Sequence, residues 1–301
     1  MDALMQPLPF DAAGLHRLSS KLMTSHHANN YGGAVKRLNA IRRRLAFAAV
    51  PGFELNGLKR EELIATNSML LHELYFASLG GDGQTMEPAM QLALRANFGS
   101  FERWRDEFVA MGKAQGGGSG WVLLVFQPRD GTLVNQWAAD HTHALAGGVP
   151  LLALDMYEHA YHLDFGAAAA AYVNAFMANI QWGAVYARYQ AAVHAASEPF
   201  AAAQEDVPGA LLLDVRRAGV YEQARTMIPG ARWCDPAAVD AWARELPAGR
   251  DVVVYCVFGH EVGRATALRV RAAGLNARFL SGGIDGWQQA GRPVQPKGDA
   301  P

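Results

Sequence analysis

The stretch that decides the fold of this chain is VPLLALDMYEH, residues 149–159. Its apolar first half predicts a short buried strand, and Asp155 would then emerge at the carboxyl end of that strand. A carboxylate at that point, with an imidazole four residues later at His159, can offer one oxygen and one nitrogen to the same ion. Such a pair suits iron or manganese. D-x-x-x-H also occurs in chains without a metal, so the remaining ligands have to come from elsewhere in the sequence.

Length and composition predict a soluble protein of two domains. The chain has 301 residues, half of them hydrophobic, and a formal net charge of -1, so neither a nucleic-acid partner nor a disordered chain is expected. The most apolar stretch, 166–186, includes Asn174, Asn179 and Gln181, which favours a buried helix over a membrane span. No signal peptide is visible, and two cysteines make no disulfide framework. We therefore expect a cytoplasmic protein.

The first part of the chain predicts an antiparallel pair of helices. Apolar residues recur at three- and four-residue steps over 15–49, with Gly32-Gly33 as an interruption, and again over 60–79, with 51–57 as the loop between. Each helix carries a histidine on its apolar side, His26 and His72.

The next part predicts a small α/β half. A helix over 87–111 with a break near 98–101 is followed by three β-type segments, and alanine-rich helices fill 166–196. The three β-type segments are 120–126, 132–138 and 149–154. We expect a three-stranded antiparallel sheet, and a first domain over 1–195 that consists of a helical hairpin (12–85) and an α/β half (86–195).

The last hundred residues have a different pattern. Residues 196–207 lack a clear period and are interpreted as a linker. In the predicted second domain, 208–301, strands alternate with helices, which implies an α/β domain with a parallel sheet. The expected strands are 211–213, 251–255 and 278–280, and the expected helices are 262–273 and 286–291.

Four residues can now be assembled into a candidate metal site: His26, His72, Asp155 and His159. They come from two helices and one strand end, so a metal among them would join the hairpin to the α/β half. His16 and His27 are alternatives to His26, and a lone histidine is more often a surface or core residue than a ligand.

Residues 8–190 resemble the iron/manganese superoxide dismutases. The resemblance is carried, in the family's order and spacing, by 8–10 (LPF), 25–27 (SHH), His72, 118–121 (GSGW) and 150–161 (PLLALDMYEHAY). It implies that the four residues bind one iron or manganese ion per chain, with solvent as a fifth ligand, and no other cofactor. It also implies that the substrate is superoxide, that the products are dioxygen and hydrogen peroxide, and that the protein is a homodimer.

The resemblance further suggests the neighbours of the metal. Trp121 and Tyr157 would form the wall of the metal pocket. His141 would hold the solvent ligand, because Ser68 stands where iron-type members have Gln. The alternative for His141 is an exposed loop histidine. Ser68 and His141 leave iron and manganese both open. Glu158 would lie at the dimer interface, where the family's residue bridges to a ligand histidine of the partner subunit. The chain departs from the family at four positions around the substrate funnel: Asn30, Ala34, Phe76 and His162, the last of which is expected at the dimer interface. We hypothesise that the hydroxyl of Tyr31 refills the funnel.

Residues 208–297 resemble a rhodanese homology domain. The matches are 213–216 (LDVR), 228–231 (IPGA), 255–262 (YCVFGHEV) and 280–287 (LSGGIDGW). Cys256 ends a buried strand in front of a helix, where backbone N–H groups and the helix dipole would stabilise a thiolate and a persulfide. The resemblance therefore implies that Cys256 is a persulfide-carrying thiol. Glu261 would repel dianionic thiosulfate, which favours another sulfur donor or a purely regulatory domain and leaves the donor and acceptor open. Cys234 is interpreted as structural or incidental.

Three functions follow from these features. The preferred hypothesis is a metal-dependent superoxide dismutase fused to a sulfurtransferase or persulfide-carrying module. In the second, sulfur transfer is the main activity and the first domain is a metal-binding dimerisation scaffold. In the third, the protein is a redox sensor.

Overall fold

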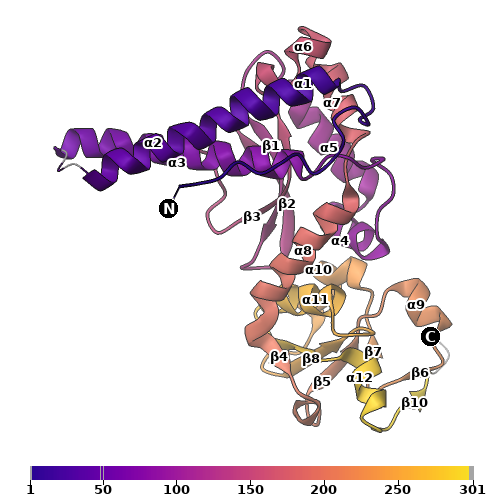
Figure 1. The fold of residues 1–301 in the computed structure, drawn as a ribbon. Helices are drawn as coiled ribbons and strands as arrows, with labels where there is room; N and C mark the ends of the chain where they lie inside the picture. The colour runs from indigo at the N-terminus through magenta and orange to yellow at the C-terminus, as the bar shows by residue number, and fades with distance from the viewer. Residues whose placement is uncertain (1, 48, 50, 298–301) are drawn as a thin grey trace.

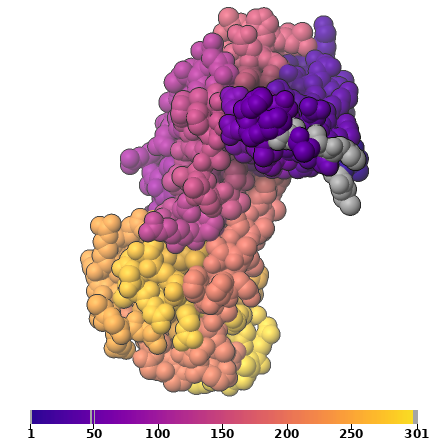
Figure 2. Space-filling view, turned by 90° about the vertical axis from the view of Figure 1, so that its left-hand side faces the viewer, coloured from indigo at the N-terminus to yellow at the C-terminus, as the bar shows by residue number. Residues whose placement is uncertain are grey.

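The computed structural model describes residues 2–297 apart from 48 and 50, and it has two lobes (Figures 1 and 2). The upper lobe combines a helical hairpin with a three-stranded antiparallel sheet, and the lower lobe holds a parallel sheet with helices around it. The predicted fold class is therefore confirmed.

The hairpin begins later than the periodicity suggested. The side chain of Ser19 caps α1 (Ser20–Ser25) by accepting a hydrogen bond from the backbone N–H of Leu22. A π-helical turn, His26–Tyr31, then leads into α2 (Gly32–Phe47). The sequence predicted an interruption at Gly32-Gly33, but the irregular segment is the π-helical turn that starts at His26. Single π turns of this kind are frequent at functional sites.

The prediction of a loop over 51–57 was wrong. Helix α3 (Gly52–Phe76) begins directly after Pro51, so it starts eight residues before the predicted Arg60 and ends three before Leu79. The first turns of this helix are exposed and carry little apolar periodicity, so only their packing beside α2 reveals them as helical. Figure 1 shows α2 and α3 projecting together from the lobe.

The α/β half follows the predicted order. Helices α4 (Pro88–Phe98) and α5 (Phe101–Ala114) meet at Gly99, whose φ of 89° breaks the helix as expected. Strand β1 (Trp121–Gln127) lies between β2 (Thr132–Ala138) and β3 (Val149–Asp155). In this register Trp121 pairs with Asp155, which places the two side by side at one end of the sheet.

Short helices and one long helix complete this lobe. A 3₁₀ turn, Glu158–Ala160, and α6 (His162–Phe165) follow β3, and then come α7 (Ala169–Met177) and α8 (Trp182–Ser197). Figure 1 shows α8 running from the upper lobe down to the lower one. No helix among the described residues is long and apolar enough to cross a membrane.

The lower lobe is built on a five-stranded parallel sheet in the order β4-β9-β8-β5-β7. Two further short strands pair antiparallel with each other. The strands of the lobe are β4 (Ala201–Ala202), β5 (Leu211–Asp214), β6 (Thr226–Met227), β7 (Arg232–Trp233), β8 (Asp251–Tyr255), β9 (Asn276–Leu280) and β10 (Gln295–Pro296). Its helices are α9 (Ala218–Gln223), α10 (Val239–Trp242), α11 (Glu261–Ala272) and α12 (Gly283–Gln289).

The segment 196–207 is not a free linker. Its residues Ala201–Ala202 form β4 and pair in parallel with the end of β9, so the chain joins the sheet immediately after α8. Two paired residues are too short to produce a strand period, which is why the sequence pattern missed this edge strand.

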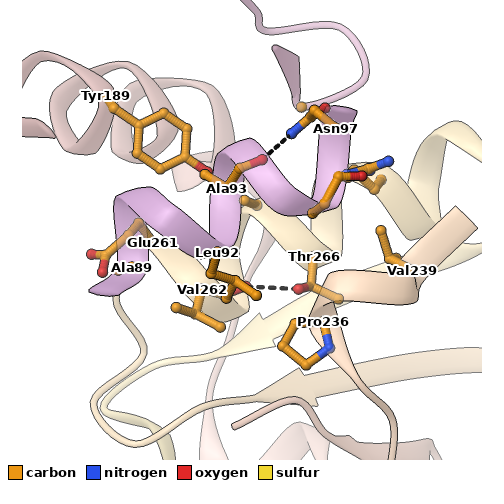
Figure 3. A pocket seen from close by; sticks show the side chains of 14 residues that line it. Ala89, Leu92, Ala93, Asn97, Tyr189, Pro236, Val239, Glu261, Val262 and Thr266 are labelled. Atoms are coloured by element: carbon orange, nitrogen blue, oxygen red, sulfur yellow. Dashed lines mark hydrogen bonds between the residues drawn. The ribbon is translucent and has the colours of Figure 1, made fainter. Parts of the chain in front are cut away.

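The two lobes pack against each other through helices. Figure 3 shows Ala89, Leu92 and Ala93 of α4 facing Val262 and Thr266 of α11. Arg269 of α11 donates a hydrogen bond of 3.1 Å to the backbone oxygen of Ala96, and Leu268 joins the apolar core of the upper lobe. The lobes therefore form a packed interface.

Candidate metal centre and thiol site

Four side chains converge at the base of the hairpin. Asp155 Oδ2 lies 3.1 Å from His26 Nε2, 3.4 Å from His72 Nε2 and 3.2 Å from His159 Nε2. His72 Nε2 and His159 Nε2 are 3.4 Å apart, and one ligand atom from each of the four residues lies within 4.8 Å of the others. The structure thus brings together all four residues that the sequence suggested as ligands.

Different elements deliver these side chains. His26 opens the π-helical turn, His72 lies in the last turns of α3, Asp155 ends β3 and His159 follows in the 3₁₀ turn. The backbone oxygen of Asp155 accepts a bond of 2.7 Å from the hydroxyl of Tyr172, and its Oδ1 accepts one of 2.9 Å from the backbone N–H of Tyr157. Only Oδ2 then points at the histidines.

The donor set fits a transition-metal ion. Around one ion with bonds of about 2.1 Å, neighbouring nitrogen and oxygen ligands lie ~3.0–3.6 Å apart, and the four separations of 3.1 to 3.4 Å given above lie in this range. Asp155 is completely buried, and among the described residues its ion-pair partners are only the three histidines. A buried carboxylate without Lys or Arg needs another positive charge nearby. His72 Nδ1 lies 2.6 Å from the backbone oxygen of Ser68, to which it donates, so Nε2 is left with a free lone pair.

Burial favours the neutral form of two of the imidazoles, which is the form that binds a metal. It lowers the pKa of His72 to about 3 and also lowers that of His26, although Asp155 opposes both shifts. For Asp155, burial raises the pKa, but the charges and hydrogen bonds of His159 and His26 outweigh it and hold that pKa well below its usual range. Asp155 is thus anionic, and His26 and His72 offer neutral nitrogens.

This arrangement predicts that the metal-free protein is labile in acid. For His72 the ordinary pKa of 6.5 falls to about 3 on folding, so below pH 6.5 the unfolded chain binds more protons. Stability contributed by this group is therefore full above pH 6.5 and falls, by at most about 1.4 kcal/mol per pH unit, down to pH 3. We expect the midpoint of urea unfolding of chelator-treated protein to drop steadily between pH 6.5 and 4. A midpoint independent of pH over this range would contradict it.

Aromatic residues surround the cluster. Trp121 packs edge-on against the ring of His72, with ring centroids 5.3 Å apart, and its Nε1 donates a bond of 3.0 Å to His141 Nδ1. Tyr157 stacks between His141 and His159, with centroid distances of 4.8 and 5.4 Å. His141 is therefore half-buried beside the cluster and has a defined partner, unlike an exposed loop histidine.

Tyr31 lies near the cluster, but its hydroxyl is engaged elsewhere. The ring stacks 6.5 Å from that of His72. The hydroxyl donates to Glu73 Oε1 at 2.8 Å and accepts from the backbone N–H of Gln6 at 2.7 Å. Burial raises the pKa of Tyr31 to about 12, so the hydroxyl keeps its proton at neutral pH. Glu73, Gln6 and Tyr172 carry no motif, and sequence reasoning missed them.

The other predicted residues lie around this centre. His27 and His16 are outside the cluster: His27 Nε2 bonds the backbone oxygen of Gln6, and His16 is exposed. Phe76 packs edge-on against His26, with ring centroids 5.1 Å apart, and Ala34 is buried. Asn30 is half-buried, while Glu158 and His162 are exposed on the surface near the site, where a second chain could reach them.

Cys256 lies in a separate site in the lower lobe. It follows β8, its side chain is buried, and backbone N–H groups of four residues point at the sulfur: Gly263, Gly259, His260 and Phe258. Burial raises the pKa of the thiol, and these N–H groups partly offset that rise. A Cβ at Gly263 would come within 3.3 Å of the sulfur, so glycine lets α11 approach it closely.

Two charged residues near Cys256 are held by partners from neighbouring elements. Arg264 is directed away: its guanidinium donates to the backbone oxygen of Gly259 at 3.0 Å and pairs with Glu198. Glu261 is turned toward the upper lobe, where Tyr186 and Gln190 donate to its two oxygens at 2.7 and 3.2 Å. Their interlobe partners cannot be read from local sequence. Cys234 is also a buried free thiol.

Comparisons with known proteins agree with this layout. Residues 86–188 match the family model of iron/manganese superoxide dismutases, C-terminal domain. A superoxide dismutase [Fe] of Cupriavidus metallidurans is 65% identical over 192 residues, which cover 63% of this chain and 97% of the relative. The chain belongs to the iron/manganese superoxide dismutase family.

More distant relatives carry both metal designations. A superoxide dismutase [Mn] 1 of Haloferax volcanii is 33% identical over 197 residues, 64% of this chain and 97% of the relative. A superoxide dismutase [Fe] of Aquifex pyrophilus is 33% identical over 192 residues, 60% of this chain and 88% of the relative. Residues 197–290 match the rhodanese-like domain, so this dismutase-family chain carries a second domain. Both predicted families are confirmed.

Proposed function

We propose that the chain is a superoxide dismutase whose metal ion is held by His26, His72, Asp155 and His159. The observation that carries the proposal is the convergence of three Nε2 atoms on one buried carboxylate oxygen, with no Lys or Arg paired to it among the described residues. An ion bound there would supply one-electron chemistry that converts superoxide to dioxygen and hydrogen peroxide.

The protein's own residues would tune this chemistry. Tyr157 and Trp121 shield the cluster from water, and the bond between Trp121 and His141 fixes the ring of His141 next to His72. A half-buried imidazole in that position could hold a solvent molecule and pass a proton. We place His141 in that role, since Ser68, with its hydroxyl 3.5 Å from His72 Nδ1, points at the ligand itself.

We propose iron as the resident metal. The 65% identity to a relative named as an iron enzyme supports this choice, against 33% for the relative named as a manganese enzyme. The test is to purify the chain from cells supplied with both metals, measure bound iron and manganese, and assay superoxide dismutation after reloading with each. About one iron per chain and activity with iron would support the proposal. A chain that binds metal without dismutation would instead favour the scaffold or sensor hypothesis, and a chain that binds neither metal would contradict the proposed metal site.

A homodimer and a cytoplasmic location are also part of the proposal. Glu158, next to the ligand His159, is exposed, as is His162, so both are accessible to a second chain beside the metal centre. Family membership supports dimer formation. Light scattering of wild type and Glu158→Ala would test whether this surface forms the interface.

We further propose that Cys256 carries a persulfide. The four backbone N–H groups around its sulfur support this second function, because they can stabilise an anionic sulfur without a nearby cation. The match of residues 197–290 to the rhodanese-like domain is consistent with it.

Tyr31 offers a test of the altered funnel. Tyr31→Phe removes the hydroxyl that links Gln6 to Glu73 beside His72. If that hydroxyl serves proton delivery, we expect dismutation to fall about tenfold, the usual scale of one lost hydrogen bond at a reacting centre, with a changed pH profile. Tyr221→Phe in the lower lobe is the control. Unchanged turnover and pH profile in Tyr31→Phe would end this hypothesis.

A further inference from the structure

The cleft in front of Cys256 has walls from both lobes. It measures about 270 Å³, the volume of roughly nine water molecules at ~30 Å³ each, which is more than a small inorganic anion needs. The upper lobe contributes the start of α4 and one residue of α8, namely Glu87, Pro88, Ala89 and Tyr186; the lower lobe contributes the Cys256 loop with Arg216, Arg217 and Val220. The dismutase domain therefore completes the thiol site.

One carboxylate of this cleft is already satisfied. Glu261 is only 6% exposed, and both of its oxygens accept hydrogen bonds from α8, from Tyr186 and Gln190. Figure 3 shows Glu261 at the start of α11, beside Ala89 of α4. Its donors are neutral, so the carboxylate stays in the wall as a fixed negative charge and does not need a ligand.

Two other charges in the cleft lack such partners. Glu87, the residue that precedes α4, lines the cleft and has no ion-pair partner among the described residues, and its buried Oε2 also lacks a hydrogen-bond partner there. A partly buried carboxylate without a counter-charge is costly, and a ligand ammonium in the cleft would offset its negative charge. Arg216 is occupied by Asp214, with Nε 2.9 Å from both carboxylate oxygens, whereas Arg217 has no ion-pair partner in the described part of the chain.

We propose that this composite site accepts sulfur from a small zwitterionic persulfide of the cysteine type rather than from thiosulfate. The inference rests on the proposed persulfide function of Cys256. The ligand's ammonium would pair with Glu87 from the dismutase domain, and its carboxylate with Arg217 from the lower lobe. Thiosulfate has two negative charges and no ammonium, so Glu87 and Glu261 would repel it, and of the cleft's arginines only Arg217 lacks an ion-pair partner in the described part of the chain.

The transfer step balances without an oxidant. The Cys256 thiolate attacks the outer sulfur of R–S–SH, and a bond forms between Sγ and that sulfur while the bond between the two donor sulfurs breaks. The electron pair of the broken bond leaves with R–S⁻, which takes a proton from water. Cys256 then holds the persulfide, stabilised by the surrounding backbone N–H groups.

The test follows Cys256 persulfide formation by intact mass in the full chain. Three donors are compared: cysteine persulfide, N-acetylcysteine persulfide, which lacks the ammonium, and thiosulfate. For wild type we expect cysteine persulfide to react at the lowest concentration. Glu87→Gln should raise the half-saturating concentration of cysteine persulfide at least about tenfold and bring it level with the N-acetyl donor. Arg217→Gln should weaken both persulfides alike.

Glu102→Gln, an exposed carboxylate on α5 outside the cleft, is the matched control and should change nothing. Wild type that prefers thiosulfate, or a preference for cysteine persulfide that Glu87→Gln leaves intact, would overturn the zwitterion inference while sulfur transfer stands. A chain that takes sulfur from none of the three donors would overturn the persulfide function and this inference with it.

Discussion

Replacing His159 by alanine is expected to leave the purified protein without bound iron or manganese and to reduce superoxide dismutation to background. His159 Nε2 lies 3.2 Å from Asp155 Oδ2 and 3.4 Å from His72 Nε2, so the substitution removes one of the four candidate ligand atoms. Groups that only orient a metal ligand typically contribute 10–100-fold to affinity, so a direct ligand should cost more than about 100-fold. Bound metal and dismutation are measured on the same sample.

His16→Ala is the matched control for this change. His16 lies in the same domain, but it is exposed and outside the cluster, so both metal content and activity should remain at wild-type levels. The His159 variant should still fold, because its side chain is only partly buried and its removal leaves room for water. Dismutation that is indifferent to His159 would refute the assignment of this cluster as the active metal centre.

Two of the four ligand candidates were predictable because they lie at points where the local pattern is strong. Asp155 follows an unbroken apolar run, and such a run predicts a buried strand whose end is defined. His72 lies within the clear period of a long helix. The choice of His26 over His27 could not be made from the helical pattern, because neighbouring residues on a helix point in different directions. The π-helical turn directs His26 towards Asp155, and the composition of the sequence does not reveal such a turn.

Contacts across the two lobes could not be predicted. Glu261 lines the thiol cleft, as expected of a repelling charge, but its two hydrogen-bond donors on α8 were not expected. Helix periodicity describes one face of one element, whereas this contact depends on how two domains dock. The same limit explains β4, whose two residues become a strand only because β9 lies beside them.

The second large effect is expected at Cys256. Cys256→Ser should abolish sulfur transfer and persulfide formation, because a serine hydroxyl is not ionised at neutral pH and cannot attack a sulfane sulfur. Dismutation should be unaffected, since the cluster of His26, His72, Asp155 and His159 belongs to the other lobe. The variant thus separates the two proposed activities within one chain.

Cys234→Ser is the matched control for the thiol. Cys234 is buried like Cys256, and burial likewise raises its pKa, but no ring of backbone N–H groups surrounds it in the described structure. It should keep full sulfur transfer even if the buried hydroxyl lowers the melting temperature. If Cys256→Ser retained persulfide formation, or if Cys234→Ser lost it at an unchanged melting temperature, the reactive thiol would have to be assigned elsewhere. If Cys256→Ser also lost dismutation while keeping its metal and its fold, the two lobes would be functionally coupled through the α8–α11 interface.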